Sequence, residues 1–152
     1  MGDLFVWKFY SHIKFIKIFF SSDDTCDLAI DLQSISSPYS GSTTGARNDY
    51  NTNCGGEGPE SIFYLDMQPR ETLTIAQTSN QLDSVHQLAY GGSCPGTTQI
   101  NCTDEPDTQS FSWTNEFNVV KRVYFMIDSK YSTGHGDFTI AWEISRGNEF
   151  GV

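Results

Sequence analysis

Acidic and amide side chains that could bind a metal ion lie in the parts of the chain richest in turn-forming residues. They are Asn48, Asp49, Glu60, Asp83, Asp104, Glu105 and Asp107. All seven fall in predicted loops or at the edges of predicted strands, where irregular backbone offers the carboxylate and carbonyl oxygens that Ca²⁺ prefers. No EF-hand spacing is present, so the ligands would have to converge through the fold.

The stretch NDYNTNCGGEGPESIFYL, residues 48–65, has two interpretations. Gly55, Gly56 and Gly58 permit backbone angles that other residues avoid, and Pro59 fixes the entry to a following strand. The stretch is then only a tight turn that leads into a strand. In the second interpretation, its Asn and acidic residues form part of a calcium site.

The cysteines are even in number in a chain rich in Ser, Thr and Asn. They are Cys26, Cys54, Cys94 and Cys102. This count predicts two disulfides and an oxidising compartment. Of the three possible pairings we favour Cys26–Cys54 and Cys94–Cys102, because the second closes a short loop around residues 95–96. Zinc is the competing interpretation, but no C-x-x-C motif or nearby histidine supports it.

Asn101-Cys102-Thr103 is an N-glycosylation sequon, which makes Asn101 a candidate glycan acceptor and supports secretion if the host is eukaryotic. Residues 1–20 hold three lysines against one aspartate, whereas the rest of the chain holds six basic against eighteen acidic side chains. Such an acidic body attracts cations or basic partners and repels nucleic acid, whose binding depends on neutralising phosphates. We therefore exclude nucleic acid as a partner.

Residues 1–22 form a predicted apolar, basic arm that is either an amphipathic helix or extended. On a helix, five large apolar residues share one face, namely Phe5, Phe9, Ile13, Ile16 and Phe20. Two lysines interrupt the apolar stretch that a secretory signal needs, and the segment is too charged for a comfortable transmembrane helix. The arm is either an assembly segment, which buries its stripe on a partner, a membrane or its own body, or a degenerate signal peptide.

Residues 23–152 are predicted to form one all-β domain. Alternation over 138–145, 123–127 and 72–76 predicts strands with one buried and one wet face. Shorter candidates cover 62–67, 88–90, 111–113, 28–35 and the stretch around Tyr39. Gly, Pro and Asn clusters separate them, as is typical of a jelly-roll-like β-sandwich. Residues 131–137, YSTGHGD, predict a hairpin between the last two strands.

Two side chains, Tyr124 and Met126, point away from the predicted core face of their strand. They either lie exposed on the face of the sandwich, where a ring such as that of Tyr124 could stack on a sugar or contact a protein, or form a second core layer.

Catalytic motifs are absent from the sequence. GGSCPG places Ser93 beside Cys94 in a glycine-rich turn, but G-x-S-x-G is missing and a disulfide loop explains the segment. The three histidines, His12, His86 and His135, are scattered. His86 is predicted to be a surface or edge residue of a strand. We therefore predict that the protein is not an enzyme.

Five short segments, in this order, resemble the bacterial pre-peptidase C-terminal domain family over about residues 25–145: GSTTGARNDY, CGGEGPESIFYLDM, LDSVHQLAYGGSCPG, INCTDE and GDFTIAWEIS. The resemblance implies a secreted jelly-roll-like sandwich, an accessory module without catalysis and, in some members, a bound calcium ion. Carried over to this chain, the calcium positions are Asn48, Asp49, Glu60, Asp83 and Asp104.

Three functional hypotheses follow. The first is an extracellular structural subunit of a surface fibre or coat, which forms a homo-oligomer or docks on another surface protein through the arm of residues 1–22. The second is a calcium-dependent glycan- or matrix-binding module. The third is an accessory domain separated from a secreted hydrolase.

Overall fold

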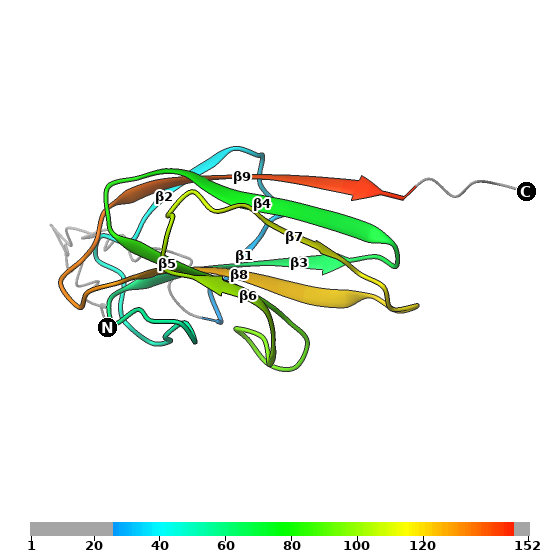
Figure 1. The fold of residues 1–152 in the computed structure, drawn as a ribbon, viewed down its shortest axis with the longest axis horizontal. Coiled ribbons are helices and arrows are strands. Elements are labelled where there is room, and N and C mark those ends of the chain that lie inside the picture. The colour runs from blue at the N-terminus through cyan, green and yellow to red at the C-terminus, as the bar shows by residue number, and fades with distance from the viewer. Residues whose placement is uncertain (1–25, 148–152) are drawn as a thin grey trace, which may run out of the picture.

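The chain folds into nine strands, and no helix occurs among residues 26–147, the part that this computed structural model describes (Figure 1). Within these residues no helix is long and apolar enough to cross a membrane. The predicted arm, with its stripe of apolar residues, lies outside the described residues. The strands are β1 (Ile30–Asp31), β2 (Tyr39–Ser42), β3 (Glu60–Met67), β4 (Glu71–Asn80), β5 (Ser84–Tyr90), β6 (Thr98–Thr103), β7 (Phe111–Thr114), β8 (Lys121–Ser129) and β9 (Asp137–Arg146).

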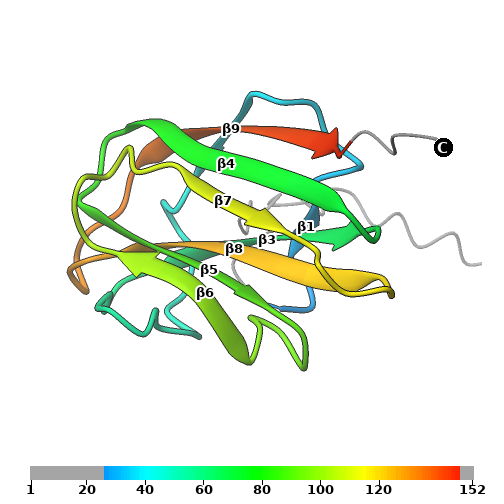
Figure 2. The same cartoon turned by 45° about the vertical axis from the view of Figure 1, so that its right-hand side comes forward.

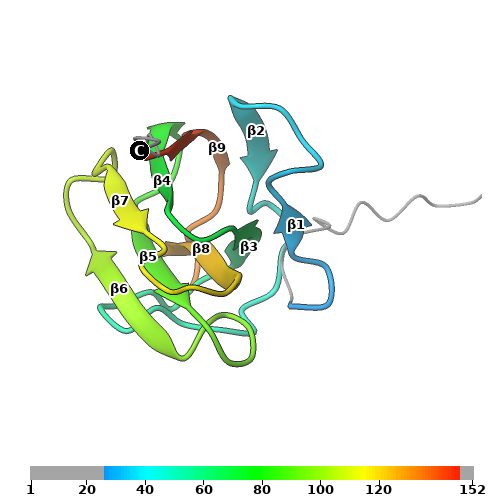
Figure 3. The same ribbon diagram turned by 90° about the vertical axis from the view of Figure 1, so that its right-hand side faces the viewer.

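The strands form two sheets that pack face to face (Figure 3). One has five strands in the order β1-β3-β8-β5-β6, and the other has four in the order β2-β9-β4-β7. All neighbours are antiparallel except β1 and β3. The prediction of an all-β fold with a sandwich-like pair of sheets is thus confirmed.

The core lies between the two sheets and is built from the inward-facing positions that the alternation predicts. Phe63 of β3 meets Phe138 of β9 edge-on at 6.1 Å, and Phe125 of β8 meets Phe111 of β7 in the same way. All four rings are buried. Because each ring pair joins one sheet to the other, these contacts fix how the sheets stack.

A second apolar layer covers the outer face of the five-stranded sheet. Ile62, Tyr124 and Met126 are buried there, with Tyr50 and the Cys26–Cys94 disulfide packed against them. The interpretation of Tyr124 and Met126 as a second core layer is therefore confirmed, and they form no exposed binding surface.

The predicted hairpin between the last two strands is wrong. β8 belongs to the five-stranded sheet and β9 to the four-stranded one, so residues 130–136 cross between the layers. Local turn residues signal a change of direction but not which sheet the next strand joins. The sequence analysis predicted no strand at β6. The side chains of β6 are mostly polar because it is an edge strand (Figure 2).

The two predicted disulfides are present, but the predicted pairing is wrong. The bonds are Cys26–Cys94 and Cys54–Cys102, with Cα–Cα distances of 5.7 and 5.9 Å. Cys94 precedes β6 and Cys102 lies near its far end. A strand rises about 3.4 Å per residue, so β6 carries Cys102 too far from Cys94 for a bond.

Candidate functional site

The loops at one end of the sandwich bring together a cluster of acidic side chains. Asp83 lies in the short turn between β4 and β5, and Glu105 and Asp107 lie in the connection from β6 to β7. One carboxylate oxygen from each of the three lies within 4.8 Å of the others. Asp83 and Glu105 are exposed and Asp107 is partly buried. We call these three residues the acidic cluster.

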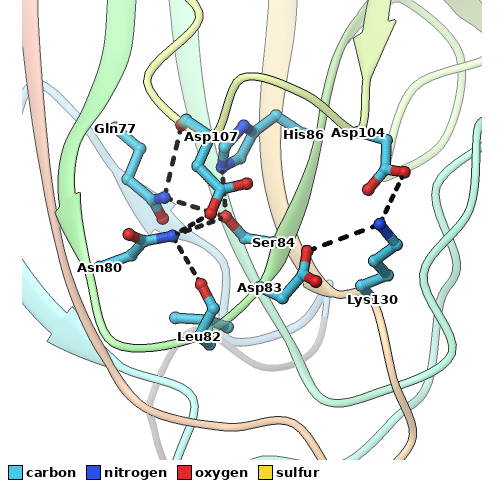
Figure 4. A network of polar contacts seen from close by, with 9 residues as sticks. All are labelled: Gln77, Asn80, Leu82, Asp83, Ser84, His86, Asp104, Asp107 and Lys130. Atoms are coloured by element: carbon cyan, nitrogen blue, oxygen red, sulfur yellow. Dashed lines mark hydrogen bonds and ion pairs between the residues drawn. The ribbon is translucent and has the colours of Figure 1, made fainter.

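Lys130 is the cation that lies beside the acidic cluster. Its Nζ is 3.0 Å from Asp104 Oδ2 and 3.9 Å from Asp83 Oδ1 (Figure 4). The hydrogen bond with Asp104 raises the pKa of Lys130, so the ammonium group stays charged. Lys130 pairs with two carboxylates, while Glu105 and Asp107 add two more acids to the same loops, so this end of the sandwich carries excess negative charge.

Two amide side chains, the buried Gln77 and the partly buried Asn80, hold Asp107 in place. Asn80 Nδ2 donates to Asp107 Oδ2, while Gln77 Nε2 donates to the backbone carbonyl of Asp107 and to Ser84 Oγ (Figure 4). Asp107 Oδ1 and Asp104 Oδ1 are buried acceptors without a hydrogen-bond partner among the described residues. A buried carboxylate oxygen without a donor is costly, so it is available to a cation.

His86 and Ser84 lie inside the sandwich behind the acidic cluster. The prediction that His86 is a surface or edge residue is wrong, because β5 is flanked by β8 and β6 and its sheet is covered on both faces. Ser84 Oγ lies 3.2 Å from His86 Nε2, but both side chains are fully buried and out of reach of a substrate. Burial lowers the pKa of His86 to about 4, so the neutral ring packs against Phe125.

The structure separates the five calcium positions into two groups. Asp83 belongs to the acidic cluster, and Asp104 lies next to it. The other three lie around the loop of residues 48–58. Asn48 Nδ2 donates to the Glu57 carbonyl, Asp49 pairs with Arg47 at 3.4 Å, and Glu60 accepts the backbone N–H groups of Asp49 and Tyr50.

Oxygen donors of the kind that Ca²⁺ prefers are therefore present in the acidic cluster, and they come from loops that can adjust to the ion. Asp107 Oδ1, which has no hydrogen-bond partner among the described residues, is a suitable ligand for the same ion. Sequence reasoning recognised Glu105 and Asp107 as loop acids, but the five-residue set did not include them. No local signal in the sequence singles them out, because their grouping depends on the connection from β6 to β7 meeting the β4–β5 turn.

Glu60 instead forms a buried pair with an acid that sequence reasoning did not consider. It lies directly opposite Asp128 in the β3–β8 register, and both side chains have no exposed surface. Burial raises the pKa of each carboxyl to about 7, although backbone N–H donors from the loop of residues 48–58 counteract part of the effect.

Comparisons with protein-family models, curated proteins and solved structures found no match to this chain. The resemblance to pre-peptidase C-terminal domains, which rests on five short motifs, therefore stays a prediction.

Proposed function

We propose that this chain is a non-catalytic extracellular binding module whose acidic cluster holds a calcium ion. The observation that carries the proposal is the convergence of Asp83, Glu105 and Asp107 within 4.8 Å, next to the orphaned Asp107 Oδ1. Carboxylates this close repel one another unless a cation lies between them. A bound calcium ion would supply that positive charge and tie the β4–β5 turn to the β6–β7 connection.

An extracellular location is supported by the two disulfides, which indicate an oxidising environment. Asn101 of the sequon is exposed on the edge strand β6, where a glycan has room. The strand order also supports the jelly-roll part of the fold prediction. β2 to β9 divide into the orders 2-9-4-7 and 3-8-5-6, as expected for two interlocked Greek keys.

A pocket beside the acidic cluster supports glycan or matrix as the ligand. It has a volume of about 430 Å³ and is lined by residues 51–57 in part, by Val85, and by Asp104, Lys130 and Tyr131. Tyr131 is 56% exposed, with Lys130 Nζ 5.8 Å from the ring centroid, so the exposed part of the ring is accessible to a sugar. We expect Tyr131→Ala to abolish calcium-dependent retention on a glycan surface while leaving calcium binding unchanged.

Isothermal titration calorimetry with calcium chloride tests the metal site. We expect wild-type protein to bind calcium, and Asp107→Asn or Asp83→Ala to weaken the affinity at least about tenfold, because each removes one of few charged ligands. The matched control is Glu143→Gln, which neutralises an exposed acid on β9, away from the acidic cluster. No binding heat at millimolar calcium with the wild type would contradict the proposal.

Assembly through residues 1–22 is the second candidate function. The observation that favours it is the apolar stripe of the arm on a chain whose remainder is strongly acidic. Such a stripe needs a partner surface to bury it. Removal of residues 1–22 should leave a folded monomer that no longer assembles, as measured by light scattering after gel filtration. A truncated protein that oligomerises like the full chain would exclude this function.

A further inference from the structure

The hydroxyl of Ser84 lies inside the sandwich between the carboxamide of Gln77 and the imidazole of His86. All three side chains have no exposed surface. Gln77 Nε2 is 2.9 Å from Ser84 Oγ, and Ser84 Oγ is 3.2 Å from His86 Nε2 (Figure 4). Because an outside substrate cannot reach these atoms, the acyl group that the hydroxyl meets is the carboxamide of Gln77.

The hydrogen bonds around Ser84 Oγ decide where its own hydrogen points. Its other two partners, Gln77 Nε2 and Asn80 Nδ2, are amide N–H groups, which only donate. The Gln77 amide is held in this orientation because its Nε2 also donates to the backbone carbonyl of Asp107. The hydroxyl hydrogen is therefore donated to His86 Nε2, which is the arrangement of a nucleophile with its general base.

The carbonyl carbon of Gln77 is close to the same hydroxyl oxygen. This carbon is bonded to Nε2 at about 1.33 Å, so it lies no more than about 4.2 Å from Ser84 Oγ. Reacting atoms approach to about 3–3.5 Å before a bond forms, so the side chains have to move by roughly 1 Å or less. Gln77 Oε1 has no hydrogen-bond partner among the described residues that would resist this movement.

We propose that Ser84 and Gln77 form an intramolecular ester cross-link once the chain has folded. His86 Nε2 takes the hydroxyl hydrogen while Ser84 Oγ attacks the carbonyl carbon of Gln77. His86 then gives this proton to the amide nitrogen, the C–N bond breaks and ammonia leaves. One C–O bond replaces one C–N bond, so the reaction needs no oxidant, reductant or co-reactant.

Burial favours both the formation and the survival of this ester. Folding holds the hydroxyl and the carboxamide side by side, so the reaction does not depend on a chance collision. The interior excludes water, which would otherwise compete with the hydroxyl and hydrolyse the ester. Ammonia is lost to the surrounding solvent, which drives the reaction in one direction. All the reacting groups are neutral at the start, so the reaction needs no ion at the acidic cluster.

The cross-link would join the two sheets of the sandwich. Gln77 belongs to β4 of the four-stranded sheet, and Ser84 belongs to β5 of the five-stranded sheet. Neither disulfide contains a residue of the four-stranded sheet, so the ester would be the side-chain bond that keeps the two layers together. The reaction occurs once in each chain and requires neither calcium nor a glycan, so it goes beyond the proposed function.

Intact-mass spectrometry during refolding tests the cross-link. The full chain is recovered unfolded from inclusion bodies, refolded in EDTA with its disulfides formed, and sampled over time after reduction. We expect the mass to fall by about 17 Da, the mass of the ammonia lost, in refolded protein only. Ser84→Ala should keep the full mass, whereas the control Ser79→Ala, at an exposed serine of β4, should lose ammonia like the wild type.

His86→Phe tests the role of the base, because it keeps a ring beside Phe125 but has no nitrogen to accept the proton. We expect the loss of ammonia to slow at least about a hundredfold in this variant. An unchanged rate would overturn the assignment of His86 as the base.

Peptide mapping locates the bond. An endoprotease that cuts before Asp83 separates residue 77 from residue 84, so the two peptides of the wild type should stay joined until hydroxylamine cleaves the ester. In Ser84→Ala they should separate at once, and Gln77→Met is the second variant if Ser84→Ala does not fold. A refolded wild type with its full mass would overturn the cross-link, and so would a loss of ammonia that persists in a folded variant. Because EDTA removes calcium, these outcomes are independent of the calorimetric test of the acidic cluster.

Discussion

The outer face of β3 and β8 carries an acid pair at one end and an ion pair at the other, and the two ends differ in how a carboxylate is accommodated. At the buried end Glu60 faces Asp128 under the loop of residues 48–58. At the open end Asp66 faces Arg122, whose Nε and Nη2 lie 2.7 and 2.6 Å from its two oxygens.

The direction of the pKa shift follows from these surroundings. The hydrogen bonds from Arg122 lower the pKa of Asp66, in a side chain that is 41% exposed. Burial raises the pKa of Glu60, six residues away on the same face of the same strand. Residue type and strand position are therefore poor guides to charge state. The charge state of the carboxyl group is set by the segment that packs over the strand and by the residue opposite on the neighbouring strand.

The largest expected effect on stability comes from removing the disulfide that holds the loop of residues 48–58 over Glu60 and Asp128. Replacing Cys54 and Cys102 together by alanine should reduce the free energy of unfolding by about 2–5 kcal/mol, because the bond restrains the unfolded chain and holds the loop over the acids. Urea denaturation measures this change. If the double variant loses less free energy of unfolding than Asp66→Asn does, the disulfide-held loop contributes no more to stability than the exposed ion pair.

The next effect is a decrease in stability with rising pH. Between pH 4 and 7 the folded protein holds protons on Glu60 and Asp128 that the unfolded chain, with carboxyl pKa values of 4.5 and 3.8, has already released. Raising the pH through this window therefore favours unfolding. His86 acts in the opposite direction below pH 6.5, because its folded pKa of about 4 lies under its ordinary value of 6.5.

Two carboxyls outweigh one imidazole, and above pH 6.5 only the carboxyls contribute. We expect the free energy of unfolding to fall by about 2 kcal/mol from pH 5 to pH 8. In Glu60→Gln with Asp128→Asn the remaining imidazole should reverse the slope below pH 6.5. Urea denaturation at several pH values checks both results, and stability that rises steadily with pH in the wild type would contradict them.

The smallest effect is expected at the open end. Asp66→Asn should change the free energy of unfolding by no more than about 1 kcal/mol, because exposed ion pairs gain little over water. The difference from the wild type should shrink as salt is added, since salt screens exposed charges. Thermal unfolding at low and high sodium chloride measures it. A loss of several kcal/mol of stability in Asp66→Asn would contradict the view that the Asp66–Arg122 pair is a weak, exposed ion pair.

The sequence predicts to which face of its sheet a side chain points, but it does not predict which other segment covers that face. Alternation along 123–127 correctly placed Tyr124 and Met126 away from the core, and the same alternation puts Asp128 beside them. The β3–β8 register, the loop over it and the Cys26–Cys94 bond all depend on contacts between distant segments, which no local pattern encodes. For the same reason the acidic residues were recognised as loop residues before their grouping was known.

Carbon-13 NMR titration of the side-chain carboxyl groups tests the central claim most directly, because the chemical shift of that carbon reports protonation at Glu60 and Asp128 individually. The account predicts that at least one of the two still holds its proton at pH 6, whereas Asp66 is fully ionised there. Complete ionisation of both Glu60 and Asp128 below pH 5, with the loop still closed, would contradict it.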